Sequence, residues 1–245
     1  MSADRIALVT GTSSGIGAAV AKELLEHGWQ VIGVARRTAR FAPGNYQHLA
    51  LDLAEVERAT ATIERELGAR LAERAWQRVG LVNNAALAPA GRVQKLDAGE
   101  LARAYAVNAV MPLWLMGFVL RQRPEGAQVR VVNISSGAAQ RPFPGLATYC
   151  STKAALRMAG MVVAAEVEDV AVFTYEPGVV DTEMQRATRE TPLEDFPWGT
   201  TFRQYHAEGR LVAPELPAAD IVEFLQADHA ERFTERRRGA EANRG

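Results

Sequence analysis

A tyrosine and a lysine four residues apart are the first candidates for chemistry in this sequence. Tyr149 and Lys153 lie near the start of the alanine-rich run "ATYCSTKAALRMAG", and on a helix residues i and i+4 share one face. A tyrosine titrates at about 10, so acid–base work near neutral pH needs about 4 kcal/mol of preferential stabilisation of its phenolate. A nearby lysine charge can supply part of that free energy. The same spacing occurs in ordinary helices, so the neighbouring motifs must decide between the two interpretations.

Polar residues at the ends of predicted strands are candidates to assist this pair. Ser135 and Ser136 end the run "VVNISS", and Asn84 ends "LVNN". In open parallel sheets, ligands bind at the carboxyl ends of the strands, where a serine hydroxyl could hydrogen-bond a substrate oxygen. Asn108 stands inside a predicted helix, where asparagine has mediocre propensity. A buried asparagine there is either structural or part of a polar relay, and both interpretations stay open.

A glycine-rich loop follows the first predicted strand. The run "VTGTSSGIG" places Gly11, Gly15 and Gly17 between that strand and a helix. Such glycines let the backbone approach a pyrophosphate, which the helix N-terminus then attracts. The alternative is a turn that only caps the helix. The position directly after the first strand favours a nucleotide site.

The residues after the second predicted strand bear on which dinucleotide binds. The run "GVARRTAR" contains Arg36 and Arg37 but no acidic residue. A carboxylate at this place suits the ribose 2′-hydroxyl of NAD, whereas arginine pairs with a 2′-phosphate through two parallel hydrogen bonds. We therefore expect NADP(H) rather than NAD(H), the alternative being a solvated loop with incidental arginines.

The order of apolar runs predicts the fold. Near-continuous Val/Ile/Leu segments alternate with helical patterns, which is typical of a parallel sheet covered on both faces. We predict an α/β Rossmann fold, a doubly wound parallel sheet in one domain over residues 1–245. A substrate-side lid is expected at about 183–217 and a frayed tail at about 236–245. The predicted strands are 5–10, 30–35, 48–53, 79–85, 128–135 and 170–178, and the main helices are about 16–28, 55–76, 98–121 and 149–165.

The composition argues against several classes of function. A formal net charge of −1 offers no basic surface for nucleic acid and no polybasic membrane anchor. No uninterrupted apolar run of about 20 residues is present, and the first residues do not resemble a signal peptide. The single cysteine, Cys150, suits a reducing compartment and lies about 100° around the helix from Tyr149, so we expect it to be a packing residue. We expect a cytoplasmic protein with no membrane or nucleic-acid partner and no metal site.

Seven short motifs occur in one order between about residues 4 and 182. They are "TGTSSGIG", "LDL", "NNAA", "VNAV", "ISS", "YCSTK" and "PGVVDT". This set resembles the short-chain dehydrogenase/reductase family in its single-domain form. The resemblance implies that Tyr149 is the general acid, that Lys153 lowers its pKa and holds the ribose, and that Asn108 continues a proton relay. It also implies that Ser136, thirteen residues before Tyr149, binds the substrate carbonyl.

The resemblance implies a set of cofactor-binding residues. Asp52 would meet the adenine, Asn84 would line the cofactor cleft, and Val180 and Thr182 would hold the nicotinamide carboxamide. The usual glycine after Asn-Asn-Ala is Ala86 here, which could crowd the cleft. The full set is Gly11, Ser13, Ser14, Gly15, Ile16, Gly17, Arg36, Arg37, Asp52, Leu53, Asn84, Tyr149, Lys153, Pro177, Gly178, Val180 and Thr182.

Longer runs resemble the branch that contains sepiapterin reductase and benzil reductase. This implies an NADPH-dependent carbonyl reductase acting on a ketone or diketone, with the helices at 98–121 and 149–165 pairing in a homodimer. The tail "RFTERRRGAEANRG" shows no clear equivalent of the acidic residue with which sepiapterin reductases anchor a pterin, so a pterin substrate is not expected. The rival hypothesis is an NADP(H)-binding protein without turnover. The candidate substrate residues are Ser136, Phe143, Tyr149, Met184, Trp198 and Phe202, with Phe196 and Tyr205 as further lid aromatics that could instead belong to the core or to an interface.

Overall fold

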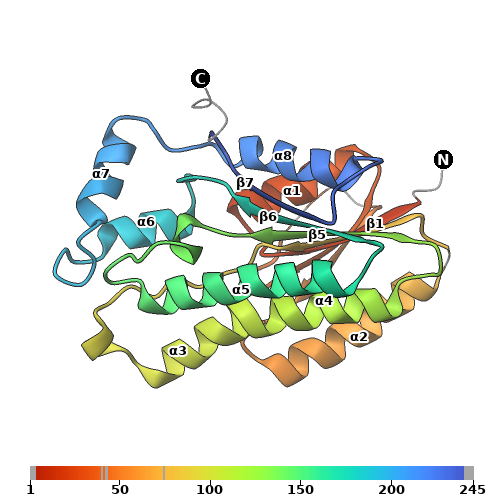
Figure 1. Ribbon diagram of the computed structural model, residues 1–245, viewed down its shortest axis with the longest axis horizontal. Coiled ribbons are helices and arrows are strands. Elements are labelled where there is room, and N and C mark those ends of the chain that lie inside the picture. The colour runs from red at the N-terminus through yellow and green to blue at the C-terminus, as the bar shows by residue number, and fades with distance from the viewer. Residues whose placement is uncertain (1–3, 40, 42–43, 74, 240–245) are drawn as a thin grey trace.

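A single parallel sheet forms the centre of the molecule. The computed structural model describes residues 4–39, 41, 44–73 and 75–239. Seven strands lie in the order β3-β2-β1-β4-β5-β6-β7, all parallel, as Figure 1 shows. The predicted doubly wound α/β fold is confirmed. The strands are β1 (Arg5–Thr10), β2 (Gln30–Ala35), β3 (Tyr46–Ala50), β4 (Arg78–Asn83), β5 (Gln128–Ile134), β6 (Val170–Glu176) and β7 (Phe233–Arg237).

Helices cover both faces of the sheet, which is why the central strands are apolar on both sides. On one face, α1 (Gly15–Glu26) and α8 (Glu215–Gln226) pack together over one hydrophobic cluster. On the other, α2 (Val56–Ala72), α4 (Met111–Gln122) and α5 (Ala147–Glu166) cover a larger cluster (Figure 1). The strand order reverses at β1 and β4, and open sheets bind ligands in the crevice at such a reversal.

The helix predicted at about 98–121 is interrupted by a π-helical turn. α3 (Ala98–Tyr105) continues through η2 (Ala106–Val110) into α4. The whole stretch, Ala98–Gln122, is long and apolar enough by composition to cross a membrane, but half of its most apolar window is buried inside the fold. Its buried side chains, such as Leu115 and Phe118, pack on the sheet.

The region predicted as a lid contains two helices. α6 (Glu183–Glu190) and α7 (Gly199–Ala207) extend beyond the carboxyl ends of the strands, and the chain then enters α8 (Figure 1). Two short 3-10 turns, η1 (Val93–Lys95) and η3 (Gly137–Ala139), lie at the same edge of the sheet.

The sequence analysis missed the last strand. Residues 236 and 237, predicted to belong to a frayed tail, are the end of β7, which pairs with β6. "FTERR" was missed because its charged residues do not give an apolar run. Those charges are typical of an edge strand. Residues 240–245 of the predicted tail lie outside the described residues.

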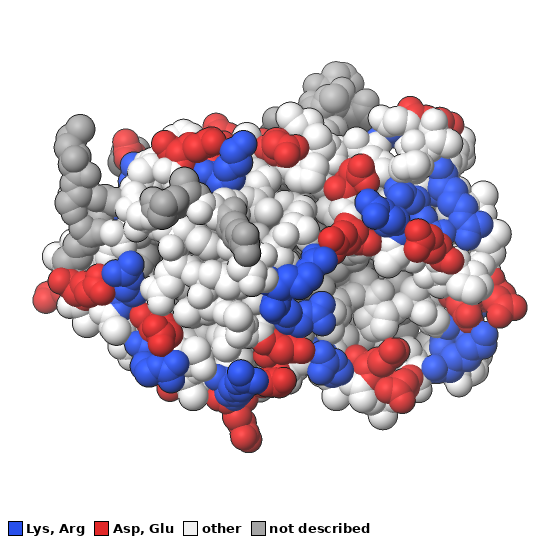
Figure 2. All heavy atoms as spheres, turned by 180° about the vertical axis from the view of Figure 1, so that it is seen from behind, with Lys and Arg blue, Asp and Glu red and all other residues white. Residues whose placement is uncertain are grey.

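Charges of both signs are mixed over the face seen from behind. Figure 2 shows basic and acidic side chains interspersed there, in agreement with the net charge of −1. The sequence-based expectation that no nucleic acid binds stays a prediction.

Candidate active site

The loop between β1 and α1 is packed against one asparagine. Gly11 has a φ of 77°, in the region that favours glycine, and a Cβ atom there would lie 2.6 Å from Asn84 Nδ2. A Cβ atom on Gly17 would lie 2.4 Å from the same nitrogen and 2.4 Å from the Gly11 carbonyl oxygen. Asn84 Nδ2 donates a hydrogen bond to the Thr10 carbonyl oxygen at 2.8 Å. Asn84 therefore holds the glycine loop in place.

The amino end of α1 is suited to a phosphate group. Ser14 precedes the helix, and its side chain makes no capping hydrogen bond. The first backbone N–H groups of a helix have no partner within the helix, and the helix dipole favours an anion there. Thr182 reaches the same place from the segment after β6, because a Cβ atom on Gly15 would lie 3.0 Å from Thr182 Cγ2. The remaining predicted cofactor residues of these two segments are Ser13, Ile16, Pro177, Gly178 and Val180.

The structure separates the two arginines that follow β2. Arg37 donates to both carboxylate oxygens of Glu183 at the start of α6, at 3.0 and 2.6 Å, and also to Ser14 Oγ at 3.2 Å. By contrast, no carboxylate of a described residue lies within 4.0 Å of the exposed Arg36 guanidinium. Arg36 is thus the arginine without a direct ion pair to a described residue, although it lies close enough to Asp52 to interact with its charge.

The predicted adenine contact, Asp52, is already engaged by the protein. Its carboxylate accepts hydrogen bonds from Arg103 Nη2 at 2.8 Å and from the Ala54 backbone at 3.0 Å. The Leu53 side chain is buried in the core cluster. These contacts fix the end of the β3–α2 connection beside Arg36.

Tyr149 and Lys153 lie one turn apart at the start of α5. The Lys153 Nζ atom is 5.6 Å from the centre of the Tyr149 ring and donates to the Ile134 carbonyl oxygen, at the end of β5, at 2.6 Å. Lys153 is 2% exposed. The lysine therefore links α5 to the carboxyl end of the sheet.

Burial dominates the ionisation of this pair. It raises the pKa of Tyr149 to about 12, although the hydrogen bond between Ser136 and Tyr149 lowers it. Burial also lowers the pKa of Lys153 to about 8. Desolvation of Tyr149 has the largest effect in the protein alone, and the role of Lys153 in lowering the tyrosine pKa stays a prediction. Tyr149 is protonated at neutral pH, the state that a general acid needs, and Lys153 is mostly charged.

Ser136, rather than Ser135, lies with Tyr149. The Ser136 side chain lies close enough to the Tyr149 hydroxyl to lower its pKa, and its Oγ accepts a hydrogen bond from the Ala138 backbone at 3.2 Å, which caps η3. Ser135 is 3% exposed, and its Oγ has no partner among the described residues. The geometry therefore supports the choice of Ser136 as the carbonyl-binding serine.

Asn108 lies in the π-helical turn, and its amide connects two elements. Its Oδ1 accepts from the Leu87 backbone at 2.8 Å, while its Nδ2 donates to the Leu87 carbonyl oxygen at 2.7 Å and to Thr152 Oγ1 at 3.0 Å. The side chain is fully buried. These contacts support the structural interpretation of Asn108, and its part in a proton relay stays a prediction.

Two threonines of the site were missed by the sequence analysis. Thr10 Oγ1 accepts hydrogen bonds from the backbone of Asn84 and of Ala85, both at 3.0 Å. Thr152 accepts from Asn108 and donates to the Tyr149 carbonyl oxygen at 3.0 Å. Thr10 could have been predicted from the sequence, because it ends the strand before the glycine loop. Thr152 could not, because its contact with Asn108 spans 44 residues and leaves no local pattern.

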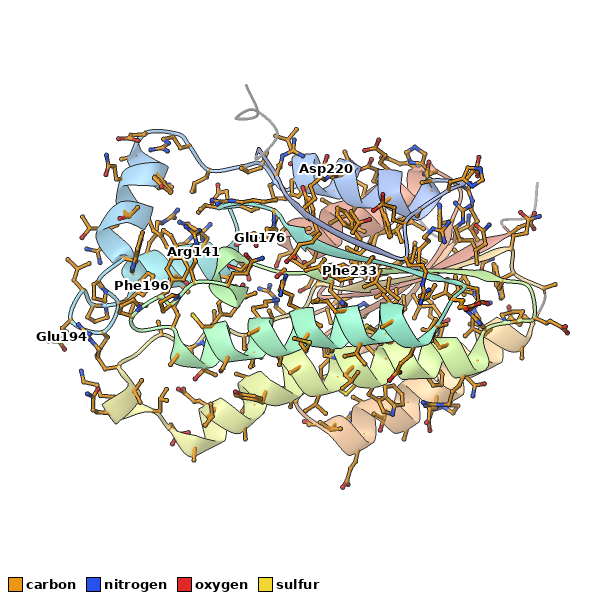
Figure 3. All side chains as sticks on the ribbon, viewed as in Figure 1. Arg141, Glu176, Glu194, Phe196, Asp220 and Phe233 are labelled. Atoms are coloured by element: carbon orange, nitrogen blue, oxygen red, sulfur yellow. The ribbon has the colours of Figure 1, made fainter. Side chains whose placement is uncertain are left out.

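The lid aromatics divide into two groups. The Phe143 and Trp198 rings meet edge to face with centres 5.2 Å apart, and Trp198 is 40% exposed. Phe196 is fully buried in the lid, and its ring centre lies 5.5 Å from that of Phe202 (Figure 3). Phe196 is therefore a packing residue rather than a substrate contact. Met184 is half-buried on α6. Phe143 and Trp198 therefore form a partly exposed aromatic pair, and their contact with a substrate stays a prediction.

Comparison with known proteins agrees with this geometry. The short chain dehydrogenase family profile matches residues 5–193. The chain belongs to the short-chain dehydrogenase family. Members of this family are oxidoreductases that use a nicotinamide cofactor and act on C–OH or C=O groups of small molecules.

Individual relatives fall in the branch that the motifs indicate. A benzil reductase ((S)-benzoin forming) of Bacillus cereus is 33% identical over 237 residues, covering 91% of this chain and 95% of that protein. A sepiapterin reductase of Meriones unguiculatus is 32% identical over 246 residues, covering 91% of this chain and 92% of that protein. Among solved structures, the KRED1-Pglu enzyme matches with a TM-score of 0.77 at 26% identity, over 94% of this chain and all of that one.

Proposed function

We propose that this protein is an NADPH-dependent carbonyl reductase that converts a hydrophobic or aromatic ketone or diketone into a secondary alcohol. The observation that carries the proposal is the arrangement of Tyr149, Ser136 and Lys153 at the carboxyl end of β5. The relative whose name states benzil reduction supports the class of substrate.

The residues present fit a dinucleotide. The glycine loop leaves no room for a Cβ atom at Gly11 or Gly17, the first N–H groups of α1 are open to a phosphate, and Arg36 makes no direct ion pair with a described residue. A guanidinium group suits the extra phosphate that distinguishes NADPH from NADH. When bound, NADPH supplies a hydride to the carbonyl carbon.

The protein's own residues would control the carbonyl oxygen. Ser136 and Tyr149 would hydrogen-bond this oxygen, and Tyr149 would donate its proton to it as negative charge develops. Lys153, fixed by the Ile134 carbonyl, would favour the phenolate that remains. The test is NADPH consumption with benzil and a panel of aromatic ketones. Binding of NADPH without turnover of any of them would instead support the binding-protein hypothesis.

Because Arg37 is paired with Glu183 and Arg36 is not, we expect replacement of Arg36 to change the preference between NADPH and NADH. Replacing Arg36 by alanine should raise the Kd for NADPH by about tenfold or more, because a charge-assisted pair with the phosphate is lost. The Kd for NADH should change little. Arg37→Ala is the matched control and should have a smaller effect, because Glu183 already neutralises Arg37. Both constants can be measured by titration calorimetry, and equal losses for the two variants would contradict the assignment.

An exposed apolar surface on η2, α4 and α5 supports a homodimer. Its side chains are 37–56% exposed: Val110, Leu113, Met158, Met161 and Val162. Exposed apolar patches on a soluble protein mark interfaces, and two-fold dimers use the same patch twice. We expect sedimentation to give twice the mass of the 26.6 kDa chain and Met158→Glu to shift it toward one chain. A wild-type mass of one chain would contradict the homodimer.

A further inference from the structure

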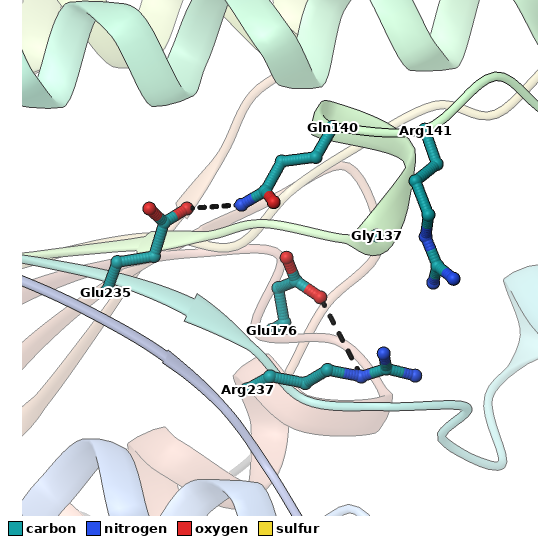
Figure 4. Close-up of a pocket in the computed structure, with 6 residues that line it drawn as sticks. All are labelled: Gly137, Gln140, Arg141, Glu176, Glu235 and Arg237. Atoms are coloured by element: carbon teal, nitrogen blue, oxygen red, sulfur yellow. Dashed lines mark hydrogen bonds and ion pairs between the residues drawn. The ribbon is translucent and has the colours of Figure 1, made fainter. Parts of the chain in front are cut away.

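A cavity lies next to the turn that carries the predicted carbonyl-binding serine. It has a volume of about 300 Å³ and lies between η3 and the carboxyl ends of β6 and β7. Because Gly137 directly follows Ser136, the cavity begins one residue from the predicted carbonyl site. Figure 4 shows the lining residues, which are Gly137, Gln140, Arg141, Glu176, Glu235 and Arg237.

One of the two carboxylates in this cavity is already paired. Glu235 receives two hydrogen bonds from Arg157 on α5, at 2.6 and 2.7 Å, and a third from Gln140 at 2.9 Å. This bidentate geometry is the strongest that arginine and a carboxylate form. The charges of Glu235 and Arg157 therefore cancel and leave little for a ligand.

The second carboxylate is only loosely paired. Glu176 is 8% exposed, and its nearest contact with a guanidinium is 4.0 Å from Arg237 Nε, which is longer than a hydrogen bond. Its carboxylate accepts no hydrogen bond from any residue that the structure describes. Burial raises the pKa of Glu176. Arg237 is thus only partly neutralised.

Arg141 makes no direct ion pair within the described part of the chain, although it lies close enough to Glu176 to interact with its charge. No carboxylate among the described residues lies within 4.0 Å of its guanidinium, which instead lies 5.9 Å from the centre of the Phe143 ring. Phe143 contacts Trp198, so Arg141 connects the cavity with the aromatic lid residues. In Figure 4 the guanidinium groups of Arg141 and Arg237 both lie on the side away from Glu235.

The cavity therefore contains three arginine and two glutamate charges, counting Arg157, and has an excess of one positive charge. Two guanidinium groups beside a small cavity are suited to a carboxylate. A guanidinium group can donate two parallel hydrogen bonds to the two oxygens of a carboxylate. We propose that this cavity binds a carboxylate group of the substrate, so that the preferred substrates are aryl ketones with an acid group remote from the carbonyl. This inference rests on the proposed carbonyl reductase function and narrows its substrate class.

The test compares acids with their neutral esters. The substrates are 3-acetylbenzoate, 4-acetylbenzoate and the methyl ester of each, with benzil as the reference ketone. For at least one acid, wild-type kcat/KM should exceed that of its ester by about tenfold or more, mainly through KM, because the charged group is remote from the reacting carbon. Arg141→Gln should bring this ratio to about one.

Two further variants distinguish charge recognition from a general loss of structure. Glu176→Gln should raise the ratio of acid to ester, because it removes a negative charge that repels the ligand. Arg58→Gln is the matched control, since Arg58 is an exposed arginine on α2 that pairs with Glu55. In Arg58→Gln, the ratio of kcat/KM for acid and ester and the kcat/KM for benzil should both equal those of the wild type.

The outcomes separate this inference from the proposed function. If benzil and both esters are reduced but neither acid is preferred, the carboxylate site is wrong and the reductase function stands. If no ketone is reduced, the proposed function is wrong. Calorimetric titration of 3- and 4-acetylbenzoate then decides the site, because binding must weaken in Arg141→Gln but not in Arg58→Gln.

Discussion

Tyr149→Phe should lower kcat/KM for ketone reduction by about a thousandfold or more. The change removes only the hydroxyl that would donate the proton, and proton transfer by a placed side chain contributes about 10²–10⁴ in rate. The loss should be in kcat, because the group acts in the transition state. Stopped-flow or steady-state NADPH consumption measures it.

The structure explains why no other group should replace this hydroxyl. Burial keeps the pKa of Tyr149 at about 12, so its proton is present throughout the neutral range. Ser136 would hydrogen-bond the same carbonyl oxygen, but a serine hydroxyl is a far weaker acid than a phenol and would keep its proton. Lys153 donates to the Ile134 carbonyl oxygen at the end of β5.

Two controls accompany this variant. The Kd for NADPH should be nearly unchanged in Tyr149→Phe, which separates catalysis from cofactor binding. Tyr105→Phe removes a hydroxyl from an exposed tyrosine on α3 and should retain full activity. Turnover above about a tenth of the wild-type rate in Tyr149→Phe would rule out this residue as the general acid.

Gly17→Ala should weaken NADPH binding at least about a hundredfold and destabilise the fold. The added methyl group would lie 2.4 Å from the Gly11 carbonyl oxygen and from Asn84 Nδ2, far inside contact distance. The glycine loop must shift to admit it, and overpacking of this kind costs about 1–3 kcal/mol in the free energy of unfolding. The shift moves the α1 N-terminus and the loop that would hold the pyrophosphate, so we expect the Kd to rise at least about a hundredfold, a change of about 2.7 kcal/mol.

A second helical glycine provides the matched control. Gly68 lies within α2, and a Cβ atom there would come no closer than 4.0 Å to the Phe118 ring. Gly68→Ala should therefore stabilise the protein by about 0.5–1 kcal/mol through helix propensity, without any effect on NADPH. Urea unfolding and calorimetry give both quantities. Equal NADPH affinity in Gly17→Ala and the wild type would show that the loop is not the cofactor site.

The sequence was sufficient to predict the elements whose signal is local. The apolar runs predicted six of the seven strands, and the spacing of Tyr149 and Lys153 placed both on one helix. The choice of Ser136 came from the family resemblance. The glycine loop could also be predicted, because its residue types are required by the backbone itself.

Contacts between distant segments could not be predicted. The pair Arg37–Glu183 spans 146 residues, so nothing local showed which of the two arginines would be paired. Asn108 required knowledge of the π-helical turn, which no propensity indicates. The strand β7 was missed because its charged residues do not form an apolar run. The raised pKa of Tyr149 and the lowered pKa of Lys153 both follow from burial, which depends on the complete fold.

The contact between Asn84 and the glycine loop has a consequence for how this chain can vary. One amide nitrogen occupies the space that a side chain would need at both Gly11 and Gly17. Substitutions at these three positions should therefore show strong epistasis, since residues in contact have non-additive effects. An evolving or redesigned version of this protein would have to change the three positions together, so that the residues under the cofactor loop form one unit of selection.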